Sequence, residues 1–419
     1  MHTFDGYSIK DYGEMVTDPL RTQAFVTALT NAITPDSVVL EIGTGAGFFA
    51  LLACKLGAKK VYAIEPDIAI EVGKLCAKNN FGSEKITWLQ GLSTEIDLPE
   101  KVDIVIGDLH GTMPFYNFNI FSMRDAVTRH MKLGGIIMPR RDVLYAAPIE
   151  SPEDYSSIEK PWASDVHGLD LSAGRSFLVN TWWRRPVTDK VNMLAAPQCL
   201  GEINYATVSS TNLDGECDWL ICTDGTVHGL SIWFDGDIGP GAGYSNAPNL
   251  PGLVYGNAFF PLEKPLTVKR GEHLLTKFSA KLIGDEYVYS WISEHFDATG
   301  KSLARFKQST FNSRPISQRK LAFASPDFVP ELNQDGEVTL QVLQAAQQKI
   351  KMADIAEKLM THFPKRFSNP QQALDTASKI IQKYQAGVCR LTLSATPIAE
   401  RSQMILTRSL AQIFTKHLQ

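Results

Sequence analysis

The sequence has little cysteine and no cluster of metal-binding side chains. Of its 419 residues six are cysteines, and only Cys217 and Cys222 lie close together, at a spacing that matches no common zinc pattern. Free thiols in a reducing compartment are therefore expected. Histidines and acids also show no metal-ligand spacing, so no metal is predicted.

Other absences exclude further classes of protein. The sequence has no run of about 18 apolar residues, so no membrane span is predicted. A net charge of −4 does not favour binding to nucleic acids or membrane surfaces. The N-terminal segment MHTFDGYSIKDYGEM lacks the basic region and apolar core of a signal peptide, and a cytoplasmic protein is expected.

Apolar runs begin to alternate with helical patterns near residue 36. The predicted strands are SVVLEIG, KVYAIEP, KITWLQG and KVDIVIGD, and the predicted helices are FFALLACKLG, DIAIEVGKLCAKNN and YNFNIFSMRDAVTRHMKLGG, the last stopped by its two glycines. Continuous apolar strands separated by helices are typical of a parallel sheet covered on both faces. The pattern therefore predicts a doubly wound, Rossmann-like α/β domain.

Beyond Pro139 the sequence changes to short strand-like runs such as VLYAAPIE and YVYSWISEHF, with turn residues between them. This pattern predicts an antiparallel β domain, either a barrel or a sandwich. From near Gly336 the apolar residues take helical spacing, which predicts a small helical C-terminal domain. The predicted domains are residues 1–145, 146–330 and 335–419.

The most informative segment is VVLEIGTGAGFFALLACKLGAKKVYAIEPD. Its Gly43, Gly45 and Gly47 lie between the first strand and the first helix, where the backbone must approach a ligand closely. Glu65 closes the second strand about 20 residues later, where an acid accepts hydrogen bonds from both hydroxyls of a ribose. These residues predict a nucleotide-containing cofactor.

Two cofactor classes use such a turn. A dinucleotide site usually carries GxGxxG, with a pyrophosphate at the helix N-terminus. Here Glu41 precedes the first glycine, and an acid at that place would repel a pyrophosphate but suit the cationic, amino-bearing end of S-adenosylmethionine (AdoMet). AdoMet is therefore the predicted cofactor, and a nicotinamide or flavin site and an empty glycine turn are the alternatives.

With these residues the chain resembles the protein arginine methyltransferase family, over roughly residues 7–300. YGEMVTDPLRT is similar to the N-terminal helix that closes over the cofactor in that family. The resemblance implies that Met15 packs on the sulfur end of the cofactor and that Arg21 binds its carboxylate. In GLSTE, which corresponds to a segment along the adenine, Ser93 would offer its backbone.

The resemblance also implies an architecture and an assembly. Residues 1–145 would form the AdoMet-binding domain with its lid helix, and residues 146–330 a β-barrel substrate domain. A dimerisation arm would lie at about 160–190, around VHGLDLS, and would make a homodimer. Residues 335–419 lie outside the resemblance. These residues show a pattern of helices followed by a predicted strand, GVCRLTL. The pattern is loosely similar to a winged-helix module, such as the PqqD-like elements that bind leader peptides. The alternative is that these residues form a cap on the barrel.

The segment GDLHGTMPFYN is similar to the loop in which that family holds a guanidinium between two glutamates, nine positions apart. The matching positions here are Asp108 and Asn117, so the pair of glutamates is not preserved. A Thr-His-Trp loop of the family falls on residues 253–255, Leu-Val-Tyr, so its histidine is also absent. Asp108 is the leading candidate for the base, His110 is the second, and Asn117 would orient the acceptor.

The sequence therefore predicts an AdoMet-dependent methyltransferase that acts on a peptide or protein side chain, with nitrogen favoured over oxygen by the resemblance. Because the acceptor side is altered, a different acceptor or a rearranged arginine site is expected. A small-molecule methyltransferase of a biosynthetic pathway and a non-catalytic AdoMet-binding scaffold are the alternatives. The Gly/Pro-rich segment GPGAGYSNAPNLPG is expected to be either a rim over the acceptor pocket or a plain hairpin tip.

Overall fold

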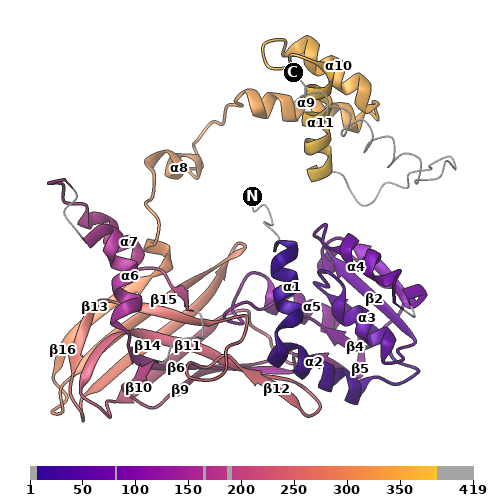
Figure 1. Ribbon diagram of the computed structural model, residues 1–419. Helices are drawn as coiled ribbons and strands as arrows, with labels where there is room; N and C mark the ends of the chain where they lie inside the picture. Colours follow the sequence, from indigo (N-terminus) through magenta and orange to yellow (C-terminus); the bar gives the residue numbers. More distant parts are fainter. Residues whose placement is uncertain (1–6, 81–82, 164–166, 186–190, 385–419) are drawn as a thin grey trace, which may run out of the picture. The chain divides into compact units, whose positions relative to one another are not determined.

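The structure, a computed structural model, describes residues 7–80, 83–163, 167–185 and 191–384. The chain divides into two compact units, Met1–Ser325 and Pro326–Gln419, whose helices and strands are labelled in Figure 1. The first unit contains both a parallel and an antiparallel part, and the second unit is helical. Among the described residues, no helix is both long enough and apolar enough to cross a membrane.

A five-stranded parallel sheet forms the first part of unit 1, in the order β3-β2-β1-β4-β5. Its strands are β1 (Val38–Ile42), β2 (Lys60–Glu65), β3 (Ile86–Gln90), β4 (Val102–Ile106) and β5 (Met131–Met138). The order reverses between β1 and β4, so the carboxyl ends of these two strands flank the crevice in which such sheets bind ligands. The predicted doubly wound domain is confirmed.

Helices cover both faces of this sheet (Figure 1). The helices of this part of unit 1 are α1 (Ile9–Thr17), α2 (Pro19–Ala32), α3 (Phe48–Lys55), α4 (Ile70–Ala77) and α5 (Asn119–His130), with short 3-10 turns η1 (Ser83–Lys85) and η2 (Ser93–Glu95). Phe25 of α2 and Phe49 of α3 share one core with Val39 of β1, whereas Met123 of α5 shares another core with Leu40. Successive residues of one strand thus enter opposite cores, as the pleat of a strand requires.

The end of α5 differs from the prediction that two glycines stop this helix. The helix ends at His130, because Met131 takes an extended conformation with ψ 142°. Gly134 and Gly135 lie inside strand β5, where the register with β4 shifts. A Cβ atom on Gly135 would lie 3.0 Å from the carbonyl oxygen of Asp103. These glycines therefore permit close strand pairing at a bulge, and they do not act as a helix stop.

The later strands of unit 1 form two antiparallel sheets, one in the order β10-β14-β15-β16 and one in the order β7-β13-β11-β6-β8, with β12 paired to β11 and β9 to β6. Their bounds are β6 (Arg141–Glu150), β7 (Trp183–Arg185), β8 (Asn192–Met193), β9 (Gln198–Asn204), β10 (Leu213–Leu220), β11 (Gly225–Gly239), β12 (Ala242–Ser245), β13 (Asn257–Val268), β14 (His273–Ile283), β15 (Glu286–Phe296) and β16 (Ser302–Ser309), followed by η4 (Thr310–Asn312).

The antiparallel domain is confirmed, but over the described residues its strands pair as two sheets and not as one closed barrel. Large aromatic side chains fill the space between the sheets. Phe260 of β13 and Trp291 of β15, which belong to different sheets, are both fully buried, and their ring centroids lie 5.1 Å apart. The two sheets therefore bury facing sides against each other.

The segment expected to be a dimerisation arm, residues 160–190, lies between β6 and β8. It includes the end of α6 (Pro152–Ala163), η3 (Ser172–Gly174), α7 (Arg175–Leu178) and β7, which is the end strand of its sheet; residues 164–166 and 186–190 fall outside the described residues. Trp162 and Leu169 of this segment are 40% and 62% exposed.

The second unit has a hydrophobic core of its own. After α8 (Gln318–Phe323), which closes unit 1, its helices are α9 (Gln334–Gln347), α10 (Met352–His362) and α11 (Pro370–Tyr384). Val338 and Val342, one turn apart on α9, pack with Leu359 of α10 and Ala377 of α11. The predicted strand GVCRLTL lies outside the described residues.

Candidate active site

A left-handed glycine turn follows β1 at its carboxyl end. Gly43, Gly45 and Gly47 have φ angles of 67°, 51° and 80°, which side-chain-bearing residues rarely adopt. Gly47 is also the N-cap of α3, and a Cβ atom there would lie 2.5 Å from the ring of Trp88. A tight left-handed turn thus leads from β1 into the N-terminus of α3, the kind of helix end at which polar and anionic ligand groups bind.

Glu65 holds the glycine turn from the neighbouring strand β2. Its carboxylate accepts hydrogen bonds from the backbone N–H of Gly45 at 2.7 Å and of Asp67 at 2.9 Å. The residue is 6% exposed, and burial raises the pKa of its carboxyl above the ordinary value. Glu65 thus lies against the turn, where the sequence predicts an acid for a ribose.

Glu41, at the end of β1, is buried below the same turn. It is 3% exposed and accepts a 2.6 Å hydrogen bond from the hydroxyl of Thr44. Burial raises the pKa of Glu41 to about 8, although the bond from Thr44 and the charge of Arg21 oppose this rise. A cation beside Glu41 would favour its charged form, which agrees with the predicted cationic end of AdoMet.

Helix α1 lies across the glycine turn. The ring of Tyr12 lies 2.4 Å from the position that a Cβ atom on Gly45 would take. The helix begins with a capping box in which Ser8 and Asp11 bond each other's backbone N–H groups. The carbonyl of Met15 accepts a 2.9 Å hydrogen bond from Arg21 of α2, which ties the two helices together.

Arg21, Asp108 and Tyr255 meet between the two parts of unit 1. The Nε of Arg21 donates to Asp108 at 2.5 Å, and its Nη2 forms an ion pair with the same carboxylate. The hydroxyl of Tyr255 donates to both oxygens of Asp108 at 2.7 Å. Burial alone would raise the pKa of Asp108, but Arg21, His110 and Tyr255 together lower it.

His110 lies two residues beyond Asp108 and is buried, with an exposure of 3%. Its Nδ1 lies 3.7 Å from Asp108, and its Nε2 lies 3.8 Å from Asp142 of β6. The hydroxyl of Tyr205 donates a 2.6 Å hydrogen bond to Asp142, which is fully buried. His110 is thus placed between two buried carboxylates.

The Gly/Pro-rich segment supplies a wall of this site. Tyr244 of β12 brings its hydroxyl to 3.4 Å from the hydroxyl of Tyr255 and 3.5 Å from His110 Nε2. Asn246 is fully buried, and its side chain donates to the carbonyl of Thr112 at 3.1 Å. The segment therefore combines a hairpin, β11–β12, with a packed rim beside the acceptor loop.

The structure brings most of the predicted site residues together. Contacts join Met15, Arg21, Asp108 and His110 into one group, and Glu41 and Glu65 flank the glycine turn beside it. Two residues lie differently. Asn117 is exposed with a φ angle of 44°, and the carbonyl of Ser93 accepts a 2.6 Å bond from Arg129. Sequence reasoning gave no role to Tyr12, Asp142, Tyr205 or Tyr244, since each enters the site only through tertiary packing.

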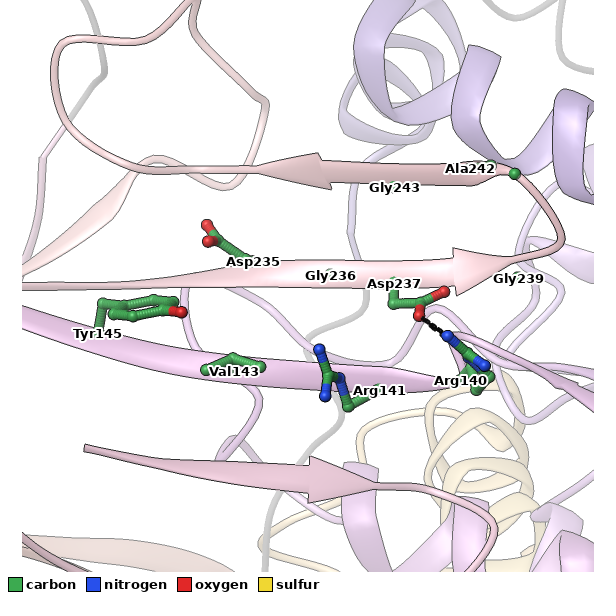
Figure 2. A pocket seen from close by; sticks show the side chains of 11 residues that line it. Arg140, Arg141, Val143, Tyr145, Asp235, Gly236, Asp237, Gly239, Ala242 and Gly243 are labelled. Carbon is green, nitrogen blue, oxygen red and sulfur yellow. Dashed lines mark hydrogen bonds and ion pairs between the residues drawn. The ribbon is translucent and has the colours of Figure 1, made fainter. Parts of the chain in front are cut away.

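A second hollow lies away from these residues. This groove, of about 430 Å³, lies over β6 and the β11–β12 hairpin. Figure 2 shows the side chains that line it, among which Arg140 points toward Asp237 and donates to it. None of the predicted site residues lines this groove. It is an open surface feature of the second sheet.

Comparisons with known proteins agree with this geometry. The ribosomal protein L11 methyltransferase (PrmA) family matches residues 20–138, the parallel sheet and its helices. The described fold resembles the Trypanosoma brucei PRMT1 enzyme-prozyme heterotetrameric complex with AdoHcy, with a TM-score of 0.65 at 22% identity over 74% of this chain and 99% of that one. A parallel sheet with a glycine turn and two acids, followed by antiparallel sheets, defines a class I methyltransferase with an added β domain.

Curated relatives identify the family. The chain is 30% identical to protein arginine N-methyltransferase 8-B of Danio rerio over 290 residues. These residues cover 66% of this chain and 68% of the relative. It is 29% identical to a probable protein arginine N-methyltransferase 6 of Arabidopsis thaliana, over 53% of each protein. The chain belongs to the protein arginine methyltransferase family. The predictions of this family, of a methyltransferase and of AdoMet as its cofactor are confirmed.

Proposed function

We propose that this protein transfers a methyl group from AdoMet to a nitrogen of a peptide or protein side chain, and that arginine is the first acceptor to test. The contact between Arg21 and Asp108 carries this proposal. It places a guanidinium, through Nε and Nη2, on the carboxylate that matches the family's first clamp position. The position and surroundings of Asp108 are therefore compatible with a guanidinium ligand.

The cofactor would be held by the glycine turn and its two acids. Gly43, Gly45 and Gly47 would let the backbone turn closely around the cofactor, Glu65 would bind its ribose, and Glu41 would lie beside its cationic end. AdoMet supplies an electrophilic methyl group when bound. Met15 would contact its sulfur end, Arg21 its carboxylate, and Ser93 the adenine side, as the family resemblance implies.

Three residues would act on the acceptor. Asp108 would bind and orient the acceptor, because it follows the carboxyl end of β4. Its neighbour Leu109 lies against Gly43, so Asp108 is close to the glycine turn. His110 is placed directly behind Asp108. Asn117, which is exposed, would contact the acceptor from the solvent side of the loop. One acid in place of two reduces the negative charge offered to a guanidinium.

Formation of S-adenosylhomocysteine from AdoMet with an arginine peptide tests this function. We expect turnover by the intact chain and a loss of at least about 100-fold in Asp108→Asn, since a charged partner of the acceptor is removed. Asp97→Asn is the matched control, because the Asp97 side chain is 94% exposed. Turnover with small molecules but not with peptides would favour a biosynthetic enzyme. AdoMet binding without any turnover would favour a scaffold.

We further propose that the protein acts in the cytoplasm as a homodimer joined through the arm around residues 160–190. Exposed apolar side chains such as Trp162 and Leu169 support this assembly, because large apolar groups in water are typical of binding surfaces. Sedimentation should show a dimer for the intact chain and a monomer for Leu169→Glu. A monomeric intact chain would refute the homodimer.

A further inference from the structure

The site contains a buried carboxylate to which neither the family resemblance nor the proposed function gives a role. Asp142 lies near the start of β6, and its side chain is fully buried. Oδ2 accepts the hydroxyl of Tyr205, and Oδ1 has no hydrogen-bond partner among the described residues. Burial raises the pKa of Asp142, whereas His110 and Tyr205 lower it. A buried acid of this kind is costly unless a neighbour compensates its charge.

His110 is the neighbour that faces this acid. Its side chain is also fully buried, and its two ring nitrogens point to different carboxylates, Nδ1 to Asp108 at 3.7 Å and Nε2 to Asp142 at 3.8 Å. Nδ1 has no hydrogen-bond partner within the part of the chain that the structure describes. The ring is held edge-on by Phe234 at 4.7 Å and by Tyr255 at 5.3 Å between centroids. Packing therefore fixes the direction of both nitrogens.

The surroundings of Asp108 disfavour its protonated form. Methylation of a nitrogen forms an N–C bond as the S–C bond of the donor breaks, and one proton of that nitrogen must then leave. The Arg21 guanidinium binds Oδ2 of Asp108, and the net effect of its neighbours is a lowered pKa of this carboxyl. Oδ1 faces His110 instead. Hydrogen bonds of catalytic groups are often long in ligand-free structures and shorten in the complex, so 3.7 Å suits a later transfer.

We propose that Asp142 is a positioning residue of the methyl-transfer site, which acts through His110 and enables this histidine to receive the acceptor proton from Asp108. The proton moves from the acceptor nitrogen to Oδ1 of Asp108 and from there to Nδ1 of His110, and Asp142 stabilises the positive charge on the ring from the Nε2 side. The other groups that face the pair are Tyr205, Tyr244, Tyr255 and Asp237. This inference rests on the proposed methyl transfer.

The coupling between His110 and Asp142 can be measured without any acceptor, by carboxyl ¹³C NMR of the full chain. The Asp142 signal is assigned as the one that is lost in Asp142→Asn. We expect His110→Gln to move the titration of Asp142 to higher pH, because a group that lowers the pKa of Asp142 is lost. His228→Gln is the matched control, since His228 is a buried histidine bonded to the backbone of Thr226 and Ser151. An unchanged titration of Asp142 in a folded His110→Gln variant would overturn the proposal.

The catalytic role is measured by S-adenosylhomocysteine formation with an arginine peptide between pH 6 and 9. We expect Asp142→Asn to lower kcat by about 100-fold near neutral pH, with partial recovery at high pH and little change in the KM for AdoMet. A kcat within about twofold of the intact chain at every pH would refute the role of Asp142. If the intact chain binds AdoMet but does not methylate the peptide, the proposed arginine acceptor fails, and the NMR result still decides whether the pair is coupled.

Discussion

The hydroxyl of Tyr255 donates to both carboxylate oxygens of Asp108 at 2.7 Å, although the two residues stand 147 positions apart in the chain. Tyr255 occupies the position at which the family resemblance places the tryptophan of a Thr-His-Trp loop. Neighbouring Val254 donates its backbone N–H to Asp18, the N-cap of α2, at 2.6 Å. The loop of the β domain is thus bonded both to the acceptor acid and to the helix that carries Arg21.

Removal of the Tyr255 hydroxyl should weaken both this connection and the fold. We expect Tyr255→Phe to lower the free energy of unfolding by about 1–3 kcal/mol, because a buried carboxylate loses one of its donors. The pKa of Asp108 should rise, since the Tyr255 bond is among the causes that lower it. The stability that Asp108 contributes is present above the pKa of an unfolded carboxyl and is lost as the pH falls, so the variant should lose less on acidification. Urea unfolding at pH 7 and pH 3, on either side of the ordinary carboxyl pKa of 3.8, measures both effects.

Tyr62→Phe is the control for this substitution. Its hydroxyl bonds Glu100, whose side chain is 45% exposed and can be solvated by water instead. A loss of stability in Tyr255→Phe no larger than that in Tyr62→Phe would contradict the structural importance of the Tyr255–Asp108 contact.

The sequence predicts the parallel sheet well because its signals are local. Apolar runs mark the strands, and the glycine turn with Glu41 and Glu65 lies within one stretch of 25 residues. The walls of the acceptor site are different in kind. Tyr244 and Asp142 have ordinary local surroundings in the sequence, and they reach His110 only because β6, β11 and β12 pair in one sheet. Such a convergence depends on the register of distant strands, which composition and periodicity do not fix.

Burial of Glu41 should make stability depend on pH. Its pKa is about 8 in the folded chain against an ordinary value of 4.5. The sign follows from linkage: the folded state binds the proton more tightly, so stability is complete below about pH 4.5 and is lost as the pH rises toward 8. We expect Glu41→Gln, which cannot ionise, to be more stable than the intact chain at pH 8 and to show no advantage at pH 5.

Thermal or urea unfolding at these two pH values measures this effect. Glu100→Gln is the control, because Glu100 is half-exposed and neighbouring Lys60 and Tyr62 lower the pKa of its carboxyl. An equal pH dependence in Glu41→Gln and the intact chain would show that Glu41 is ionised in the folded protein.

Loss of the Glu65 carboxylate should weaken AdoMet binding by at least about tenfold, because a charged acceptor for ribose hydroxyls and a support of the glycine turn are removed together. Calorimetry of the intact chain and Glu65→Ala measures the change. Glu65→Gln separates the two contributions, since an amide oxygen can still accept from Gly45 but carries no charge. If Glu65→Ala binds AdoMet as tightly as the intact chain, the ribose position assigned to Glu65 is wrong.

Two glycines with positive φ angles allow the space at the cofactor turn to be tested separately from backbone strain. Gly57, with φ 100°, has no atom within 4 Å of a Cβ added to it, whereas a Cβ on Gly47 would lie 2.5 Å from Trp88 and 3.1 Å from the Cα of Gly73. Gly57→Ala should therefore cost only the left-handed conformation, about 1–2 kcal/mol. Gly47→Ala should cost more than this and should also abolish AdoMet binding, because α3 and β3 must separate to admit the methyl group. Unfolding curves and AdoMet calorimetry of the two variants provide the comparison. If both variants lose the same stability and Gly47→Ala still binds AdoMet, the close packing of Trp88 against Gly47 is wrong.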